Sequence, residues 1–317
     1  MAERSSVERR DAGEGADADR GADLAVDLAV IGAGAAGLFA SIWAARTNPR
    51  VRVIALDGAR KLGAKILVAG GGRCNVTHHA VSERDFSGST PAAIRRVLER
   101  FGVAQVVEYF GSLGVALTRE QTGKLFPTTD DARTILNALL DDARNHGVTL
   151  MHPARVRAVR ARAGASDSNE FARFELETDI GRVAAKRIIL AAGGRALPKS
   201  GSDGAGFDLA RSLGHSLSER ITPALVPLLL ADGHWIRTIP GVAADAEVVV
   251  RDGGRIVRRD RGSVLCTHFG LSGPAVLDAS RHLLNAIDGT LSVRWLPGVP
   301  DDRLDAWLRA PEAPTIG

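Results

Sequence analysis

The sequence predicts an α/β fold built on a parallel sheet, and three observations support that class. An apolar run at residues 28–31 is followed by a glycine-rich loop and an alanine-rich helical stretch, and then by a second apolar run at residues 51–56. These segments fit within about 30 residues, the size of a βαβ unit. A βαβ unit joins two parallel strands by a right-handed crossover. With 317 residues, of which 45% are hydrophobic, the chain has enough apolar side chains for two domains.

The first predicted domain spans residues 25–198. Residues 1–24 are charged, rich in Gly and Ala and poor in large apolar side chains, so we expect a disordered leader there. The first helix should run over residues 34–46, where an Asn-Pro pair ends it, and the second strand should cover residues 51–56.

Further helices and strands complete this domain. Apolar residues recur at helical spacing over residues 91–114, and a second helix is expected at residues 130–146, with Asp130 or Asp131 as its N-cap. The expected strands cover Val148 to Met151, Arg155 to Val159, the segment FARFELET after a polar hairpin tip GASDSNE, and Arg187 to Ala192, which ends in a Gly-Gly pair.

The second predicted domain spans residues 199–317. A Pro/Gly/Ser cluster at residues 198–202 separates the pattern of the first sheet from the rest of the chain. One helix is expected at residues 204–213. Mainly β pattern is then expected in LVPLLL, in EVVVRDGGRIVRR with a turn at residues 252–254, and in SVLCTH, and a short helical stretch begins at Asp301.

Gly32, Gly34 and Gly37 form a Gly-x-Gly-x-x-Gly pattern directly after the first strand and at the start of its helix. In a dinucleotide-binding fingerprint the first glycine allows a tight turn, the second lets a pyrophosphate approach the backbone, and the third lets helix and strand pack closely. The N–H groups at the helix N-terminus then hold the phosphates. Asp57 ends the second strand, where a carboxylate can accept hydrogen bonds from a ribose. The sequence therefore predicts a Rossmann-like dinucleotide site; the alternative is a tight turn with coincidental spacing.

A second glycine cluster, Gly70–Gly72, is followed by Arg73, Cys74 and Asn75, and Lys65 precedes it. Three successive glycines allow the backbone to pass close to a flat ligand or to another chain segment. Arg73 and Lys65 could place positive charge near a pyrophosphate or near the ring of a flavin. A flexible loop whose cations face the solvent explains the same pattern, and spacing alone does not decide between the two.

Five further segments, together with the fingerprint, carry a resemblance that runs in order from about Asp27 to about Arg281. By these segments the chain is similar to the bacterial aminoacetone-oxidase-like family of FAD-binding flavoproteins. The segments are GAKILVAGGGRCNVTH, GKLFPTTDDARTILNAL, RIILAAGGRALPKSGSDGAGFDLARSLGH, TPALVPLL and CTHFGLSGPAVLDASR.

The resemblance implies a glutathione-reductase-type, FAD/NAD(P)-binding Rossmann-like domain at residues 25–198. Into such a domain the family inserts a β-barrel-like substrate domain with a small helical segment, which corresponds here to residues 199–317. The family chain ordinarily continues into a glycine-rich return segment that closes over the flavin ring. Because this sequence stops at Gly317, we expect the inserted domain to be incomplete and the C-terminal return segment to be missing.

The resemblance also implies which residues hold the FAD. The glycine loop would cradle the pyrophosphate, and Asp57 would bind the ribose, although most relatives carry Glu there. The second glycine cluster and a strand end would lie beside the cofactor, and Val156 would touch the adenine through its backbone. The implied cofactor-binding residues are Gly32, Ala33, Gly34, Ala35, Ala36, Gly37, Asp57, Lys65, Arg73, Cys74, Asn75, Val156, Ala192 and Gly193.

The implied function is that of an FAD-dependent oxidoreductase. Hydride would pass between FAD and a small organic substrate or NAD(P)H, and this chemistry needs mainly orientation and electrostatics from the protein. No catalytic residue is predicted, and the sequence holds no nucleophile-elbow or HExxH signature. Two alternatives stay open: a nucleotide-binding regulatory or inactive flavoprotein module that lacks turnover, and an NAD(P)-binding dehydrogenase without flavin.

Composition argues against other classes of partner. The net charge of +4 reflects 41 Lys+Arg against 37 Asp+Glu, and the basic residues are scattered rather than clustered. With 4% aromatic residues and one Tyr, the chain offers little surface for stacking bases, so we expect no nucleic-acid partner. Residues 28–45 carry no charge, but no basic region precedes them and three glycines interrupt them, so we expect no membrane partner.

The cysteines and histidines predict neither a disulfide scaffold nor a metal site. Cys74 and Cys266 are far apart and form no Cys-x-x-Cys pattern, which fits a reducing, cytoplasmic location. Cys74 is expected to pack beside the flavin rather than to act as a catalytic thiol, since a flavin disulfide reductase needs two close cysteines. His78 and His79 should point to opposite faces of a strand and should therefore not bind one metal ion.

Overall fold

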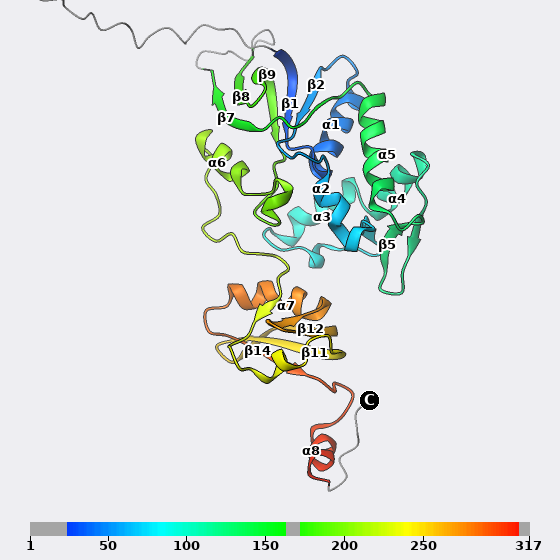
Figure 1. Cartoon of the computed structure of the whole chain (residues 1–317), viewed down its shortest axis with the longest axis vertical. Helices are drawn as coiled ribbons and strands as arrows, with labels where there is room; N and C mark the ends of the chain where they lie inside the picture. Colours follow the sequence, from blue (N-terminus) through cyan, green and yellow to red (C-terminus); the bar gives the residue numbers. More distant parts are fainter. Residues whose placement is uncertain (1–23, 163–171, 311–317) are drawn as a thin grey trace, which may run out of the picture. The chain divides into compact units, whose positions relative to one another are not determined.

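The computed structural model describes residues 24–162 and 172–310 (Figure 1). Three predicted features lie outside these residues: the leader before Leu24, the hairpin tip GASDSNE and the terminal segment PEAPTIG. The described chain forms two compact units, which divide between Leu217 and Ser218.

This division falls later in the chain than the predicted boundary after residue 198. Helix α6 (Ala205–Ser212) accounts for the difference. Its Leu209 is buried in a core of the first unit together with Val156 and Val159. The helix therefore belongs to the first unit.

The first unit is built on a six-stranded sheet with the strand order β6-β2-β1-β9-β8-β7. The strands are β1 (Leu24–Ile31), β2 (Val53–Leu56), β6 (Thr149–Met151), β7 (Val156–Ala161), β8 (Phe174–Thr178) and β9 (Gly181–Leu190). β6, β2, β1 and β9 pair in parallel, whereas β8 and β7 continue the sheet with antiparallel pairs. Leu28 is in register with Val53 of β2 on one side and with Arg187 of β9 on the other. The predicted α/β class with parallel strands is confirmed.

Alternate residues of β1 enter two hydrophobic cores. The helical segments of this unit are α1 (Ala35–Thr47), α2 (Ala64–Val68), α3 (Pro91–Arg100), α4 (Val103–Ser112), α5 (Ala132–Asn145) and α6, with 3-10 turns η1 (Ala69–Gly72), η2 (Glu83–Asp85) and η3 (Pro198–Ser200). Leu28 and Val30 pack in the core that holds buried residues of α1, α4 and α5. Ala29 and Ile31 pack in the other core, which holds Leu209 of α6. Cover on both faces explains why residues 28–31 of this strand are continuously apolar.

The helical periodicity over residues 91–114 resolves into two helices. α3 ends at Arg100 and α4 begins at Val103. Between them Gly102 adopts an extended backbone conformation, and its N–H donates to the Gln105 Oε1 atom at 3.0 Å. The apolar spacing continues across the break, so periodicity alone does not reveal it.

The N-cap of α5 is Asp131 rather than Asp130. The Asp131 Oδ1 atom accepts a hydrogen bond from the Arg133 N–H at 2.8 Å, which satisfies one of the free donors of the first helical turn. Asp130 precedes it with a φ of 54°, a left-handed conformation that an N-cap does not adopt.

A small three-stranded antiparallel sheet, β3 (Thr77–His78), β5 (Lys124–Pro127) and β4 (Leu117–Arg119), completes the first unit. The prediction that His78 and His79 point to opposite faces of a strand is wrong, because β3 ends at His78. Their ring centroids are 4.5 Å apart, and both rings contact backbone carbonyls of residues 122–123. Within the described residues, no group of three or more His, Cys, Asp or Glu side chains is placed to hold a metal ion.

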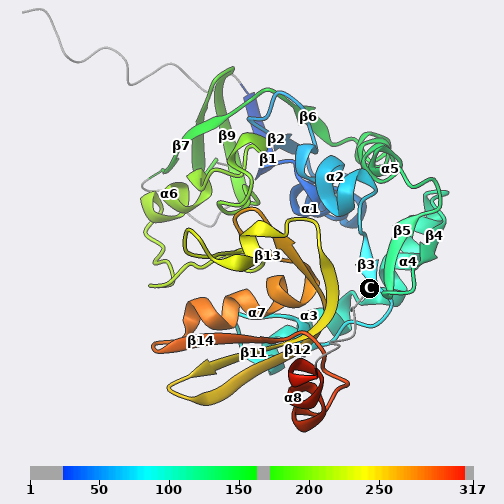
Figure 2. The same cartoon turned by 60° about the horizontal axis from the view of Figure 1, so that its bottom comes forward.

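The second unit is a five-stranded antiparallel sheet with the order β10-β13-β12-β11-β14 (Figure 2). Its elements are β10 (Leu228–Leu229), η4 (Trp235–Thr238), β11 (Ala243–Asp252), β12 (Arg255–Thr267), β13 (Gly270–Ser272), α7 (Pro274–Asn285), β14 (Gly289–Arg294) and α8 (Asp301–Arg309). The resemblance implied a β-barrel-like domain; the described strands form one open sheet with β10 and β14 as its outer strands. Ala275, Val276 and Ala279 of α7 share a core with Val248 and Val264 of the sheet.

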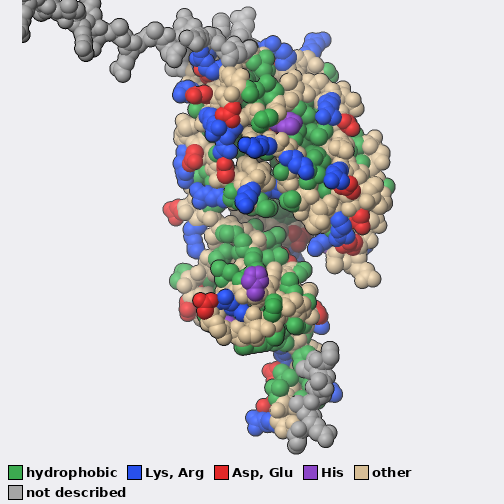
Figure 3. All heavy atoms as spheres, viewed as in Figure 1, with side chains coloured by type: hydrophobic (Ala, Val, Ile, Leu, Met, Phe, Trp, Pro, Cys, Tyr) green, Lys and Arg blue, Asp and Glu red, His purple; other side chains and the backbone are tan. Residues whose placement is uncertain are grey.

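The charged surface is mixed in sign. Figure 3 shows Lys and Arg side chains interspersed with Asp and Glu over the visible face. Several exposed arginines are paired, for example Arg157 with Asp179 at 2.7 Å and Arg259 with Glu247 at 2.8 Å. None of the helices in residues 24–162 and 172–310 is long and apolar enough to cross a membrane.

Asp142 on α5 is a buried carboxylate in the core of the first unit. Its side chain is 5% exposed, and its Oδ2 atom accepts a hydrogen bond from the Tyr109 hydroxyl at 2.8 Å. His146 Nδ1 lies 3.1 Å from the other carboxylate oxygen, Oδ1. The Arg46 Nη1 atom lies 3.9 Å from Oδ2. Burial, together with the hydrogen bond to Asp142, raises the pKa of Tyr109, so its hydroxyl stays a donor at neutral pH. The carboxylate thereby joins α1, α4 and α5.

We expect Asp142→Ala to lower the free energy of unfolding by about 2–4 kcal/mol, because it leaves the buried Tyr109 hydroxyl without its acceptor. Asp141→Ala is the matched control, since Asp141 is exposed and pairs with Arg144 on the helix surface. Its expected effect is below about 1 kcal/mol. Urea denaturation followed by circular dichroism measures both, and equal losses would contradict the proposed role of Asp142.

Candidate functional site

The three fingerprint glycines have three different environments at the turn from β1 to α1. Gly32 has a φ of 98°, and a Cβ there would lie 2.6 Å from the Ala191 carbonyl oxygen at the end of β9. A Cβ at Gly37 would lie 1.7 Å from the Gly32 carbonyl oxygen. A Cβ at Gly34 would have no atom within 4 Å. Gly32 and Gly37 are thus required by backbone packing, whereas Gly34 leaves space beside the helix N-terminus.

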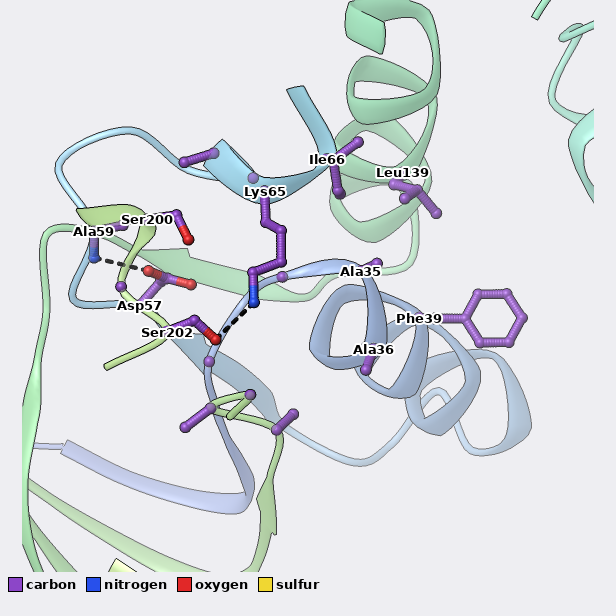
Figure 4. A pocket seen from close by; sticks show the side chains of 18 of the residues that line it. Ala35, Ala36, Phe39, Asp57, Ala59, Lys65, Ile66, Leu139, Ser200 and Ser202 are labelled. Atoms are coloured by element: carbon purple, nitrogen blue, oxygen red, sulfur yellow. Dashed lines mark hydrogen bonds between the residues drawn. The ribbon is translucent and has the colours of Figure 1, made fainter. Parts of the chain in front are cut away.

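That space is part of a cavity of about 680 Å³ at the carboxyl ends of β1 and β2 (Figure 4). Most residues implied by the resemblance line it: Gly32, Gly34, Ala35, Ala36, Asp57, Lys65, Cys74, Asn75, Val156, Ala192 and Gly193. Ala33, Gly37 and Arg73 do not line it. The structure therefore brings together side chains from β2, α2, β7 and the segment after β9 around one turn of backbone.

Asp57 is fixed at the end of β2 by two backbone donors. Its Oδ2 atom accepts from the Ala33 N–H at 2.7 Å, and its Oδ1 atom accepts from the Ala59 N–H at 2.8 Å. An ionised carboxylate oxygen has two lone pairs, so each oxygen keeps an acceptor position for a ligand hydroxyl. The geometry fits the ribose contact predicted for this residue.

Lys65 on α2 reaches across the cavity to the segment after β9. Its Nζ atom donates to the Ser202 Oγ atom at 2.7 Å, as the dashed line in Figure 4 shows. Ser202 is buried, and a Cβ at Gly193 would lie 2.5 Å from its Oγ atom. The ammonium group has two further protons with which it can bind an anion. Gly193 is therefore needed for the contact that orients Lys65.

Arg73 does not line the cavity, and its partners do not line it either. Its guanidinium lies 4.1 Å from the centroid of the Phe126 ring and pairs with Glu120 and Asp130. These partners belong to the β4–β5 hairpin and the turn after it. The charge of Arg73 thus holds the glycine-rich loop against this hairpin in the described structure.

Cys74 and Asn75 follow Arg73 and do line the cavity. Cys74 has a φ of 63°, a conformation that few residues other than glycine adopt, and it follows Arg73, whose φ of −97° ends the run of positive φ values at Gly70–Gly72. Its side chain is buried and makes no disulfide. Burial raises the pKa of the Cys74 thiol, which keeps the thiol protonated at neutral pH.

The sequence did not point to two parts of the cavity wall. One is polar and comes from Arg155, Ser200, Ser202 and Asp203; the last three lie in the segment RIILAAGGRALPKSGSDGAGFDLARSLGH, which carries the resemblance although no role was assigned to them. The other is aromatic and comes from Phe39, Phe101, Tyr109 and Phe110, which lie in segments where the sequence predicted helices but no site. Figure 4 shows Asp57, Ser200 and Ser202 on one side of the N-terminus of α1 and Phe39 and Leu139 on the other.

The lining predicts the chemistry of a ligand. Backbone N–H groups at the N-terminus of α1 suit a phosphate, and Asp57 suits a sugar hydroxyl. The apolar wall suits a flat ring, and a volume of about 680 Å³ lies within the range of ligand cavities. These features fit a dinucleotide.

Comparisons with known proteins agree with this geometry. Residues 26–285 match the HI0933-like protein Rossmann domain. The chain is 36% identical over 260 residues to a 3-dehydro-bile acid delta(4,6)-reductase of Clostridium scindens, covering 82% of this chain and 61% of that protein. It is 30% identical over 291 residues to a ribosomal RNA dihydrouridine synthase of Escherichia coli, covering 89% of this chain and 66% of that one. The chain thus spans about three fifths to two thirds of these relatives.

Solved structures that match part of the chain include two oxidoreductases. The open conformation of a flavocytochrome c3 fumarate reductase matches with a TM-score of 0.44 and 17% identity, covering 74% of this chain and 48% of that chain. The 3-ketosteroid-delta4-(5alpha)-dehydrogenase of Rhodococcus jostii RHA1 matches with a TM-score of 0.43 and 15% identity, covering 74% of this chain and 60% of that chain.

The contrast between Gly34 and Gly37 is directly testable. Gly34→Val should leave the unfolding midpoint within about 3 °C of the wild type but abolish binding of ADP, because a Cβ there has no protein atom within 4 Å and the side chain would occupy the space for the pyrophosphate. Gly37→Val should lose folded protein, since its Cβ would overlap the Gly32 carbonyl. Thermal denaturation and titration calorimetry with ADP measure the two effects, and retained ADP affinity in Gly34→Val would contradict the site.

The buried thiol gives a second test. Native protein should react with iodoacetamide at pH 7.5 at least about tenfold more slowly at Cys74 than the urea-unfolded chain does, because the native thiol is protonated and covered. Mass spectrometry of the alkylated peptide follows the reaction. Fast native alkylation would show that the loop opens and that Cys74 is reactive.

Proposed function

The chain belongs to the HI0933-like family of Rossmann flavoproteins, and from this premise we propose that it is an FAD-dependent oxidoreductase that reduces carbon–carbon double bonds. The observation that carries the proposal is the cavity at Gly34, where the absence of a Cβ leaves room beside the helix N-terminus. The names of two relatives support the reductive direction. One is a delta(4,6)-reductase, and the other makes a dihydro nucleoside.

Different residues of the cavity would bind different parts of the FAD molecule. The loop at residues 32–37 would hold the pyrophosphate through its N–H groups, and Asp57 would bind the ribose of the adenosine half. Val156 would contact the adenine, as the resemblance implies. Lys65 would place its charge near the pyrophosphate or near the flavin ring, and Cys74 would supply neutral packing because its thiol stays protonated.

When bound, FAD supplies the redox chemistry: a hydride passes to one carbon of the double bond, a proton adds to the other, and NAD(P)H restores the reduced flavin. The apolar cavity wall includes Phe39 and Phe110, which would limit the access of water to the bound cofactor. Asp57 and the α1 N-terminus fix the position of the adenosine end, so that orientation is the main contribution of the protein. A small substrate with a double bond conjugated to a carbonyl fits the name of the first relative.

The protein should bind FAD and turn over through it. Purified protein, or apoprotein supplied with FAD, should show the two visible flavin bands, and anaerobic NADH or NADPH should bleach them. A 3-oxo-4-ene steroid should then restore the colour, whereas the saturated 3-oxo steroid, which lacks the double bond, should not. Stopped-flow absorbance measures each step.

Other results would redirect the proposal. A colourless protein that takes up no FAD would contradict it. Bound flavin that neither nicotinamide bleaches would support a nucleotide-binding module without turnover. Recovery of colour by a uridine-containing RNA but not by the steroid would place the substrate in the class named by the second relative.

A further inference from the structure

Arg155 and Asp203 form an ion pair in the wall of the cavity. The Arg155 Nη2 atom donates to the Asp203 Oδ2 atom at 2.6 Å, and about one third of each side chain is exposed. A Cβ at Gly58 would lie 2.9 Å from the Arg155 Cβ atom, which places Arg155 next to the residue that follows Asp57. The pair therefore lies at the end of the cavity where Asp57 would bind the ribose.

Arg155 is the positively charged side chain near Asp57, at the end of the cavity where the ribose would bind. Among the described residues that line the cavity, two carry positive charge, Lys65 and Arg155, and two carry negative charge, Asp57 and Asp203. Lys65 donates to Ser202 and Arg155 donates to Asp203.

The position and charge of the Asp203 carboxylate favour its ion pair with Arg155. Its Oδ1 atom accepts from the Ala205 N–H at 3.1 Å at the start of α6, which fixes the carboxylate. The hydrogen bond from Arg155 lowers the pKa of Asp203 below its ordinary value. Asp203 is therefore ionised at neutral pH.

A nucleotide with a 2′-phosphate needs different residues at its ribose site from a nucleotide with free ribose hydroxyls. An acidic residue at the end of the second strand binds the ribose hydroxyls, whereas a 2′-phosphate needs a nearby arginine. In this chain the acid is Asp57, and the nearby arginine is already paired.

We propose that Asp203 is a specificity-determining residue, which holds Arg155 away from a 2′-phosphate and so reserves the cavity for FAD against NADPH. The inference rests on the proposed FAD site. NADPH and FAD share an adenosine diphosphate half, and NADPH is a candidate electron donor for the same protein. Without this discrimination the donor would compete for the site of the cofactor.

The test compares ADP with 2′,5′-ADP on apoprotein by titration calorimetry. Asp203→Asn keeps an oxygen that can accept from the Ala205 N–H but removes the charge, so it should free Arg155 without losing the hydrogen bond at the first residue of α6. The preference of the wild type for ADP over 2′,5′-ADP should fall by about tenfold in this variant. The double variant Asp203→Asn, Arg155→Gln should restore the preference, because the freed cation is gone.

Asp179→Asn is the matched control. It breaks the Arg157–Asp179 pair, which involves a β7 residue two positions after Arg155 but not the lining of the cavity, and it should leave the preference unchanged. Arg155→Gln alone should also leave the preference unchanged, since Arg155 is already committed to Asp203. This variant keeps the test valid if Asp203→Asn fails to fold.

Three results would overturn the inference: an unchanged preference in folded Asp203→Asn, an equal gain for both nucleotides, or loss of 2′,5′-ADP binding in Arg155→Gln alone. Failure of the proposed function is distinguishable from these. It would appear as wild-type protein that binds neither ADP nor FAD, whereas failure of the inference alone leaves ADP and FAD binding intact.

Discussion

The close approach between helix α1 and strands β1 and β9 is the constraint on which the site depends. A Cβ at Gly37 would lie 1.7 Å from the Gly32 carbonyl oxygen, and a Cβ at Gly32 would lie 2.6 Å from the Ala191 carbonyl oxygen. No other residue fits at these two positions without moving the backbone. The N-terminus of α1 is thereby held at the carboxyl ends of the strands, where its unpaired N–H groups can bind an anion.

Further contacts extend this local turn into a cavity. Asp57 accepts a hydrogen bond from Ala33 within the turn, so the same loop that can hold a phosphate also orients the carboxylate that can hold a ribose. The other polar contacts join segments that are distant in sequence, namely Lys65 with Ser202 and Arg155 with Asp203. The positions of the α1 N-terminus and of Asp57 are therefore set by local contacts. The arrangement of charged side chains in the cavity wall is set by packing between segments that are distant in sequence.

This division explains which features could be predicted from the sequence. The turn, α1, β2 and Asp57 follow from glycine spacing and apolar runs, because each depends on neighbours within about 30 residues. The partners of Arg73 could not be predicted, since Glu120 and Phe126 reach it through the β4–β5 hairpin. Ser202 and Asp203 were missed for the same reason. The break at Gly102 and helix α7 were missed because apolar spacing gives a period but neither marks interruptions nor separates short helices from turns.

The backbone at Gly34, Ala35 and Ala36 is proposed to form the anion site of an FAD cavity, and every other role assigned to the cavity wall depends on it. A crystal structure of the protein with bound FAD tests this most directly. We expect pyrophosphate oxygens within hydrogen-bond distance of these N–H groups and a ribose hydroxyl on the Asp57 carboxylate. An FAD molecule bound elsewhere, with the cavity at Gly34 filled by solvent, would contradict the proposed site.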